Sequence, residues 1–183
     1  MFQLTGKSEP IENFVKSQAT IKYDEFSEWC LKRGWTPMFE WCSPAAQIVL
    51  KYEKDCLKLI SVRDNLTGLY LPYMDMSRLA AKCNVPVVRH WKPEEFGLEI
   101  NSEGNASMPI NDKTLPALRQ REGVEGFVIR FDNGEMYKIK TQWYFSLNKS
   151  LDLLKHRSER HLWQSILEEK FDDVKGKFLL CVA

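Results

Sequence analysis

Residues 125–141 of the chain read EGFVIRFDNGEMYKIKT. The pair Asn133-Gly134 stands between two runs rich in β-branched and aromatic residues, which is the strongest short-range signal for a β-hairpin. With these two residues as the loop, Phe131 faces Met136 across the hairpin. The sequence therefore predicts two antiparallel strands paired in this register.

The register also predicts which side chains share a face, because facing residues point to the same side and successive residues alternate. One face is predicted to carry Glu125, Phe127, Ile129, Phe131, Met136, Lys138 and Lys140. The other face is predicted to carry Val128, Arg130, Tyr137 and Ile139. The first face thus places a carboxylate and two lysines, about 6–7 Å apart along one strand, among apolar groups.

Two explanations of this charged face stay open. In the first, the face is solvated and the lysine stems cover apolar surface. In the second, Lys138 and Lys140 bind a phosphate, and Glu125 holds a divalent metal ion against the same phosphate. A nucleotide or a polyphosphate is then the expected ligand.

The rest of the chain predicts an α+β fold, in which helices flank a twisted antiparallel sheet. Apolar spacing predicts helices over 18–33 and 150–170, with Gly34 as the stop of the first. Shorter helices are predicted from Asp75 or Ser77 to near residue 83, and over 113–121. Strands are predicted on both sides of a turn within 35–50, and over 58–63, 69–71 and 86–91.

The composition is typical of a globular protein. The chain has 183 residues, of which 44% are hydrophobic and 28% are charged, and this excludes disorder of the whole chain. Lys and Arg number 26 against 25 Asp and Glu, so nucleic-acid binding would need a local basic patch. No signal peptide or membrane-length apolar run is seen, which predicts a cytoplasmic protein. The five cysteines contain no Cys-x-x-Cys pair and predict reduced, mostly buried thiols.

Three segments resemble motifs of a known enzyme family. EGFVI at 125–129, followed by KIK at 138–140 and Trp143-Tyr144, is similar to motifs IV and V of the covalent nucleotidyltransferases. TPMFEWCSP at 36–44, continuing to Ile48-Val49, is similar to motif III, and LISVRDN at 59–65 resembles the strand that follows it. The similarity runs with gaps from about 34 to 150, and it is greatest to the ATP-dependent RNA ligases of the T-even phage type.

This resemblance implies a nucleotidyltransferase-like sheet and a ligase that uses ATP and Mg²⁺. Such an enzyme attaches AMP to a lysine, transfers it to an RNA 5′-phosphate, and joins that end to a 3′-hydroxyl, with tRNA among the candidate substrates. By the same resemblance, Glu40 would contact the adenosine ribose, Glu125 would assist the metal, and Lys138 and Lys140 would contact the nucleotide phosphates. Without the resemblance, Glu40 would be read as a solvated acid on an edge strand.

The sequence departs from the family at the nucleophile. The family's reactive lysine lies in a Lys-x-Asp-Gly motif, and the chain contains no Asp-Gly dipeptide. The segment 22–25, KYDE, has Glu25 where glycine is required, and it lies in a predicted helix. Residues 2–8 resemble the segment that follows the nucleophile, so we expect the chain to begin just downstream of it, with the sheet incomplete on that side.

Two classes of function follow from the missing motif. In the first, the chain is part of a ligase completed by a second polypeptide, an N-terminal fragment that carries the nucleophilic lysine. In the second, it is a non-catalytic nucleotide- or RNA-binding module, or the relic of an enzyme. A truncated gene is a third explanation. In the first case, residues 1–149 form a partial adenylation domain, and residues 150–183 begin a C-terminal helical region.

Overall fold

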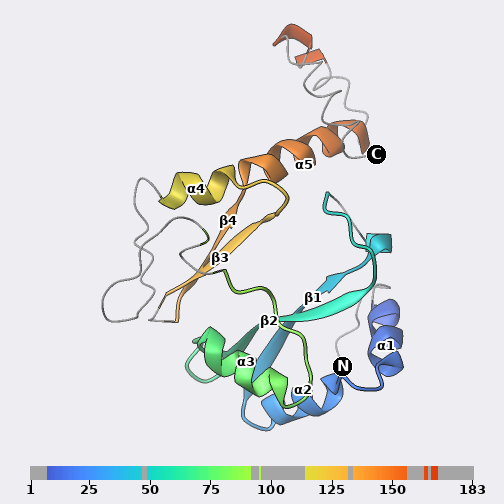
Figure 1. Cartoon of the computed structure of the whole chain (residues 1–183), viewed down its shortest axis with the longest axis vertical. Helices are drawn as coiled ribbons and strands as arrows, with labels where there is room; N and C mark the ends of the chain where they lie inside the picture. The colour runs from blue at the N-terminus through green and yellow to red at the C-terminus, as the bar shows by residue number, and fades with distance from the viewer. Residues whose placement is uncertain are drawn as a thin grey trace. The chain divides into compact units, whose positions relative to one another are not determined.

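The structure is a computed structural model that describes residues 8–46, 49–91, 114–131 and 134–155, together with Glu95, 163–164 and 166–168. These residues form helices and two separate two-stranded antiparallel sheets (Figure 1), so the predicted α+β class is confirmed. The chain divides into two compact units. Of the described residues, the first unit contains 8–46, 52–90, 130–131 and 134–136, and the second contains the others.

The first unit is organised by a sheet of two long strands, β1 (Trp35–Cys42) and β2 (Cys56–Asp64). Phe39 is paired with Leu59, whereas Met38 is paired with Ser61. Ile60 is therefore an extra residue on β2, which is a β-bulge. The bulge keeps Leu59 and Val62 on the same buried face of the sheet although three positions separate them.

Two helices cover this face, α2 (Tyr23–Leu31) and α3 (Tyr73–Ala81), as Figure 1 shows. Their apolar residues recur at three- and four-residue steps, so each helix presents one stripe to the sheet. The core that results consists of Tyr23, Phe26, Cys30, Leu57, Leu59, Val62, Met76, Ala80 and Val85. The phenol of Tyr23 also donates a hydrogen bond of 2.8 Å to the carbonyl of Leu57, which fixes α2 against β2.

Several predicted elements of the first unit are wrong in their extent. The described part of 43–50 contains no second strand: Pro44–Ala46 form a 3₁₀ turn, in which Pro44 cannot donate to a ladder, and residues 47–48 lie outside the described residues. Segments 69–71 and 86–91 make only isolated bridges with β2. The helix predicted over 18–33 begins at Tyr23, and α3 begins at Tyr73, before Asp75 and Ser77. Helix α1 (Ser8–Ser17) was not predicted.

The second unit contains the hairpin of β3 (Gly126–Arg130) and β4 (Met136–Lys140), apart from its turn-proximal residues 130–136. It also contains α4 (Thr114–Gln120) and α5 (Gln142–Lys155). Helix α4 confirms the short helix predicted over 113–121. Helix α5 begins before the predicted 150, directly after β4, so that helix and strand share one short junction. In the residues that the structure describes, no helix is long and apolar enough to cross a membrane.

Candidate functional site

The register of the hairpin differs from the predicted one by one residue. The amide of Phe131 donates to the carbonyl of Glu135 at 2.9 Å, and the amide of Thr141 donates to the carbonyl of Glu125 at 3.0 Å. These two bonds define Phe131–Glu135 and Glu125–Thr141 as facing pairs, so three residues separate the strands at the turn. Gly134 has a φ of +85°, and glycine in this conformation is typical of a three-residue hairpin loop.

The shift changes which residues share a face, because a slip of one residue moves every side chain to the other side. Gly126 now faces Lys140, Val128 faces Lys138, and Arg130 faces Met136. Val128 and both lysines are exposed, whereas Phe127 is buried on the opposite face. The predicted placing of the lysines among Phe127 and Ile129 is therefore wrong, and so is the predicted separation of Arg130 from the lysines.

The charged cluster itself is present in the structure. The Glu125 carboxylate lies 2.8 Å from Nζ of Lys138 and 3.6 Å from Nζ of Lys140. Glu125 precedes β3, and its side chain reaches the lysine face from a bend. The Glu125 side chain is 31% exposed, and those of Lys138 and Lys140 are 58% and 48% exposed. All three groups can therefore reach a ligand from solvent.

Tyr144 supports one side of this cluster. The ammonium of Lys140 lies 5.0 Å from the centroid of the Tyr144 ring, which is the geometry of a cation–π contact. Tyr144 is buried in the first turns of α5. The position of the Lys140 ammonium is thus set by a carboxylate and by an aromatic ring.

Gly126 allows the two strands to approach closely at this point. A Cβ at Gly126 would lie 2.1 Å from the carbonyl oxygen of Ile139, which is far inside the van der Waals contact distance. Any side chain here would push β3 away from β4. The glycine therefore holds Glu125 next to the lysine-bearing strand.

Thr141 fastens the site to α5. Its buried hydroxyl donates a hydrogen bond of 2.8 Å to the carbonyl of Val124 and accepts one of 3.1 Å from the amide of Tyr144. The hydroxyl thus caps α5 at its N-terminus and holds the bend that carries Glu125. The sequence analysis did not identify Thr141. A threonine directly before a helix, as Thr141 is before α5, is nevertheless a recognisable N-cap signal.

Thr141→Val is expected to lower the free energy of unfolding by about 1–3 kcal/mol, because it leaves the Val124 carbonyl and the Tyr144 amide without this partner. Thr141→Ser keeps the hydroxyl and is expected to retain most of the stability. Urea unfolding of both variants measures the difference. Equal stability of the Val and Ser variants would contradict the role of the hydroxyl.

Arg130 anchors the turn-proximal part of the hairpin within the first unit. Its guanidinium donates to the carbonyl of Ile60, and Nη1 lies 3.5 Å from the hydroxyl of Ser61. Burial lowers the pKa of the Arg130 guanidinium from its ordinary value. Arg130 therefore has a structural role at the β2 bulge.

Glu40 lies in the first unit, whereas Glu125, Lys138 and Lys140 lie in the second. On β1, Glu40 is exposed and faces Lys58 of β2. This pair occupies the face of the sheet opposite to the Phe39–Leu59 pair, of which Leu59 is buried. The structure therefore brings Glu125, Lys138 and Lys140 together. The fourth predicted site residue, Glu40, belongs to the other unit.

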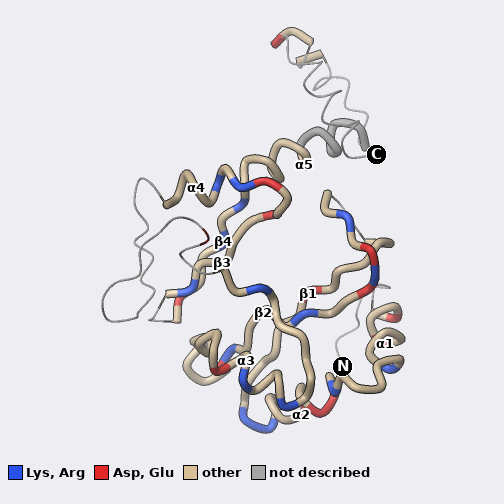
Figure 2. The backbone as a smooth tube through the Cα atoms, viewed as in Figure 1, with Lys and Arg blue, Asp and Glu red and all other residues tan. Residues whose placement is uncertain are grey.

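The described stretches contain no group of three or more His, Cys, Asp or Glu residues that could hold a metal ion. A magnesium ion is commonly bound by one or two carboxylates together with substrate phosphates. Glu125 fits such a site as its protein ligand, with the phosphates as the remaining ligands. Figure 2 shows that acidic and basic positions are mixed along the chain, so the ligand chemistry depends on this local cluster.

Comparisons with known proteins agree with the motifs. The family model described as RNA ligase matches residues 4–145. The chain is also similar to a protein of Thermovibrio ammonificans named "Putative RNA ligase", with 29% identity over 149 residues. The match covers 79% of this chain and 35% of that protein, so the chain spans well under half of the relative's length.

Proposed function

Because this chain belongs to the T4-type RNA ligase family, we propose that it supplies the nucleotide-phosphate site of an ATP-dependent RNA ligase. The substrates are ATP and RNA ends with a 5′-phosphate and a 3′-hydroxyl, with tRNA as a candidate. Residues 1–149 form part of the adenylation domain, and residues 150–183 begin a helical region. The availability of ATP and RNA favours the cytoplasm, in the host cell if the gene is of phage origin.

The observation that carries this proposal is the Glu125–Lys138–Lys140 cluster. Two ammonium groups on one exposed strand face match the charge of adjacent phosphate oxygens, and hydrogen bonds to charged groups are the strong ones. In the free protein, Glu125 pairs with both lysines and leaves the cluster with a net positive charge. A bound triphosphate replaces Glu125 as the ion-pair partner of the lysines. The Glu125 carboxylate then lies beside anionic phosphate oxygens.

This exchange favours the binding of a divalent cation together with the triphosphate. Glu125 and the phosphate oxygens repel each other unless a cation lies between them, and Mg²⁺ accepts this combination of ligands. When bound, Mg²⁺ would neutralise phosphate charge during transfer of the adenylyl group. Lys138 and Lys140 orient the phosphates, which is the main requirement of this kind of transfer.

The finer steps of the reaction rest on the family. A lysine amine attacks the α-phosphate of ATP and releases pyrophosphate, and the AMP then passes to the RNA 5′-phosphate before the ends are joined. Glu40 would accept hydrogen bonds from the ribose hydroxyls. Since the chain has no Lys-x-Asp-Gly motif, we propose that a second polypeptide supplies the nucleophile.

Glu125→Gln tests the proposal through metal dependence. Wild type is expected to bind ATP more tightly with Mg²⁺ than with a chelator. The variant is expected to lose about 1.5–3 kcal/mol of this metal effect, the range for a hydrogen bond to a charged group, while metal-free binding is retained or improved. Calorimetric titration with and without Mg²⁺ measures both values.

Glu122→Gln is the matched control, because Glu122 is an exposed acid three positions away. It is expected to keep the full effect of Mg²⁺. An unchanged effect of Mg²⁺ in Glu125→Gln would remove Glu125 from the metal site.

A further inference from the structure

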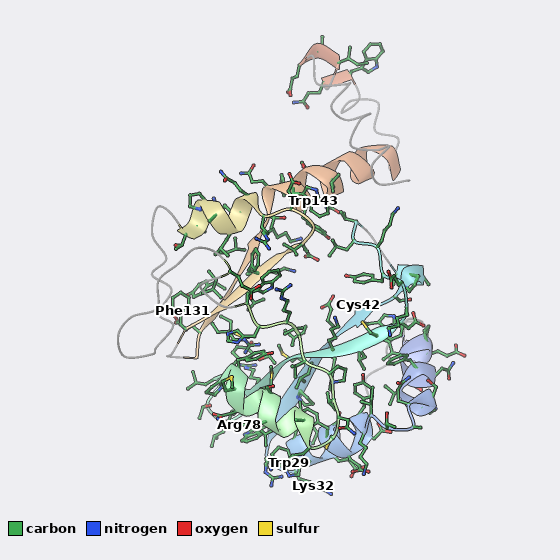
Figure 3. The ribbon with its side chains drawn as sticks, viewed as in Figure 1. Trp29, Lys32, Cys42, Arg78, Phe131 and Trp143 are labelled. Atoms are coloured by element: carbon green, nitrogen blue, oxygen red, sulfur yellow. The ribbon has the colours of Figure 1, made fainter. Side chains whose placement is uncertain are left out.

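Two cysteines face each other at one end of the β1–β2 sheet. Cys42 is the last residue of β1, Cys56 is the first residue of β2, and their Cα atoms are partners in the ladder. Both thiols are free. Cys42 is labelled in Figure 3, where its sulfur is seen on β1.

The ladder position satisfies the geometry of a disulfide. Residues directly opposite each other in an antiparallel pair have Cα atoms about 4.5–5.5 Å apart, and disulfides join Cα atoms about 4.4–6.8 Å apart. Facing side chains also point to the same side of the sheet. In agreement with this, the pKa of the Cys42 thiol is raised by burial and, in addition, by the neighbouring Cys56 thiol. A bond between the two sulfurs therefore requires little movement of the backbone.

The two thiols differ in their access to solvent. Cys42 is only 8% exposed, and burial raises the pKa of its thiol from the ordinary value. Cys56 is half-buried and more open to solvent. A soluble oxidant therefore meets Cys56 first, and Cys42 is placed to react with the oxidised sulfur.

We propose that Cys42 and Cys56 form a reversible disulfide site that responds to hydrogen peroxide. The Cys56 thiolate attacks the peroxide O–O bond, which breaks, so that Cys56 becomes a sulfenic acid and one water is released after protonation. The Cys42 sulfur then attacks the Cys56 sulfur, the S–O bond breaks, and the hydroxyl leaves as water with the Cys42 proton. Two thiols are oxidised, and one peroxide is reduced to two waters.

The disulfide would close the β1–β2 connection of residues 43–55. It would lie on the same face of the sheet as the facing pair Glu40–Lys58. The two pairs are two residues apart along each strand, which is about 6–7 Å. Its formation does not depend on ligase function, because it requires only the ladder geometry, the different burial of the two thiols and thiol chemistry.

The test treats the full chain with hydrogen peroxide under native conditions, blocks the remaining thiols and digests with trypsin. Cleavage after Lys and Arg places Cys42 in the peptide 34–51, Cys56 in 55–58, Cys30 in 23–32 and Cys83 in 83–89. We expect mass spectrometry to find 34–51 joined to 55–58. We also expect the oxidised protein to melt at a higher temperature than the reduced protein, with the difference removed by dithiothreitol.

Cys56→Ser is expected to abolish the linked peptide and the peroxide-dependent rise in melting temperature. Cys83→Ser is the matched control, because Cys83 is also half-buried and free, and it is expected to retain both. Failure of 34–51 and 55–58 to join in a natively folded sample, or joining of 34–51 to another cysteine peptide, would overturn the proposal.

Discussion

Lys138→Ala and Lys140→Ala are each expected to weaken ATP binding by about 1–3 kcal/mol, or roughly 5- to 150-fold. Each substitution removes an ammonium group from the cluster around Glu125. The free energy of unfolding should change little, because exposed ion pairs contribute only about 0–1 kcal/mol to stability. Calorimetric titration for binding and urea unfolding for stability separate the two effects.

Lys32→Ala is the matched control for these variants. Lys32 is also exposed and also pairs with a glutamate, since its Nζ lies 3.7 Å from the Glu28 carboxylate. It is labelled in Figure 3. Equal losses at all three positions would indicate binding to general positive charge, and unchanged binding in both hairpin variants would remove the phosphate site.

The charged cluster could be predicted from the sequence although the register could not. The Asn133-Gly134 pair favours a two-residue loop, but the same residues suit a three-residue loop in which only Gly134 needs a positive φ. Burial of Phe127 and Thr141 on one face favours the second arrangement. The sequence of the turn does not predict which strand face is buried, because burial depends on contacts with residues distant in the sequence.

The charged cluster forms in the observed register, as in the predicted one, because Glu125 lies outside the regular strand. Within β4, Lys138 and Lys140 share a face in either register, since they are two residues apart. A side chain in the preceding bend is free of that alternation, so Glu125 can reach the lysine face after the slip. Phe127 and Ile129, which were predicted to lie beside the lysines, belong to β3, and they lie on the opposite face in the observed pairing.

The parts of the fold that the sequence predicted well have strong periodicity. Helix α2 lies within the helix predicted over 18–33 because its apolar spacing is regular. Strands β1 and β2 overlap strands predicted within 35–50 and over 58–63, but their direct pairing was not predicted. The signal for α1 was also present, since Ile11, Phe14 and Val15 follow helical spacing. The roles of Arg130 and Thr141 were unpredictable in detail, because each bonds to backbone carbonyls of residues far away in the sequence.

The chain alone, given labelled ATP and Mg²⁺, is expected to form no covalent lysyl-AMP. Such a nucleophile needs a lysine with a lowered pKa, aimed at the α-phosphate. The sequence lacks the Lys-x-Asp-Gly motif that carries it in the family. Addition of a polypeptide that supplies this motif is expected to produce a labelled protein and ligation of RNA ends. Denaturing gel analysis of both samples measures the label.

A labelled band from the chain alone would show that this chain carries a nucleophile of its own. Lys7 and Lys22 would then be the first positions to replace. Lys7 lies outside the described residues. At Lys22, hydrogen bonding to Glu25 at 3.1 Å raises the pKa of the amine, which is the opposite of what a nucleophile requires. If neither polypeptide is labelled and the mixture does not ligate RNA, the absent motif favours a nucleotide- or RNA-binding module. Retained ATP binding through Lys138 and Lys140 would then identify the cluster as a binding site without catalysis.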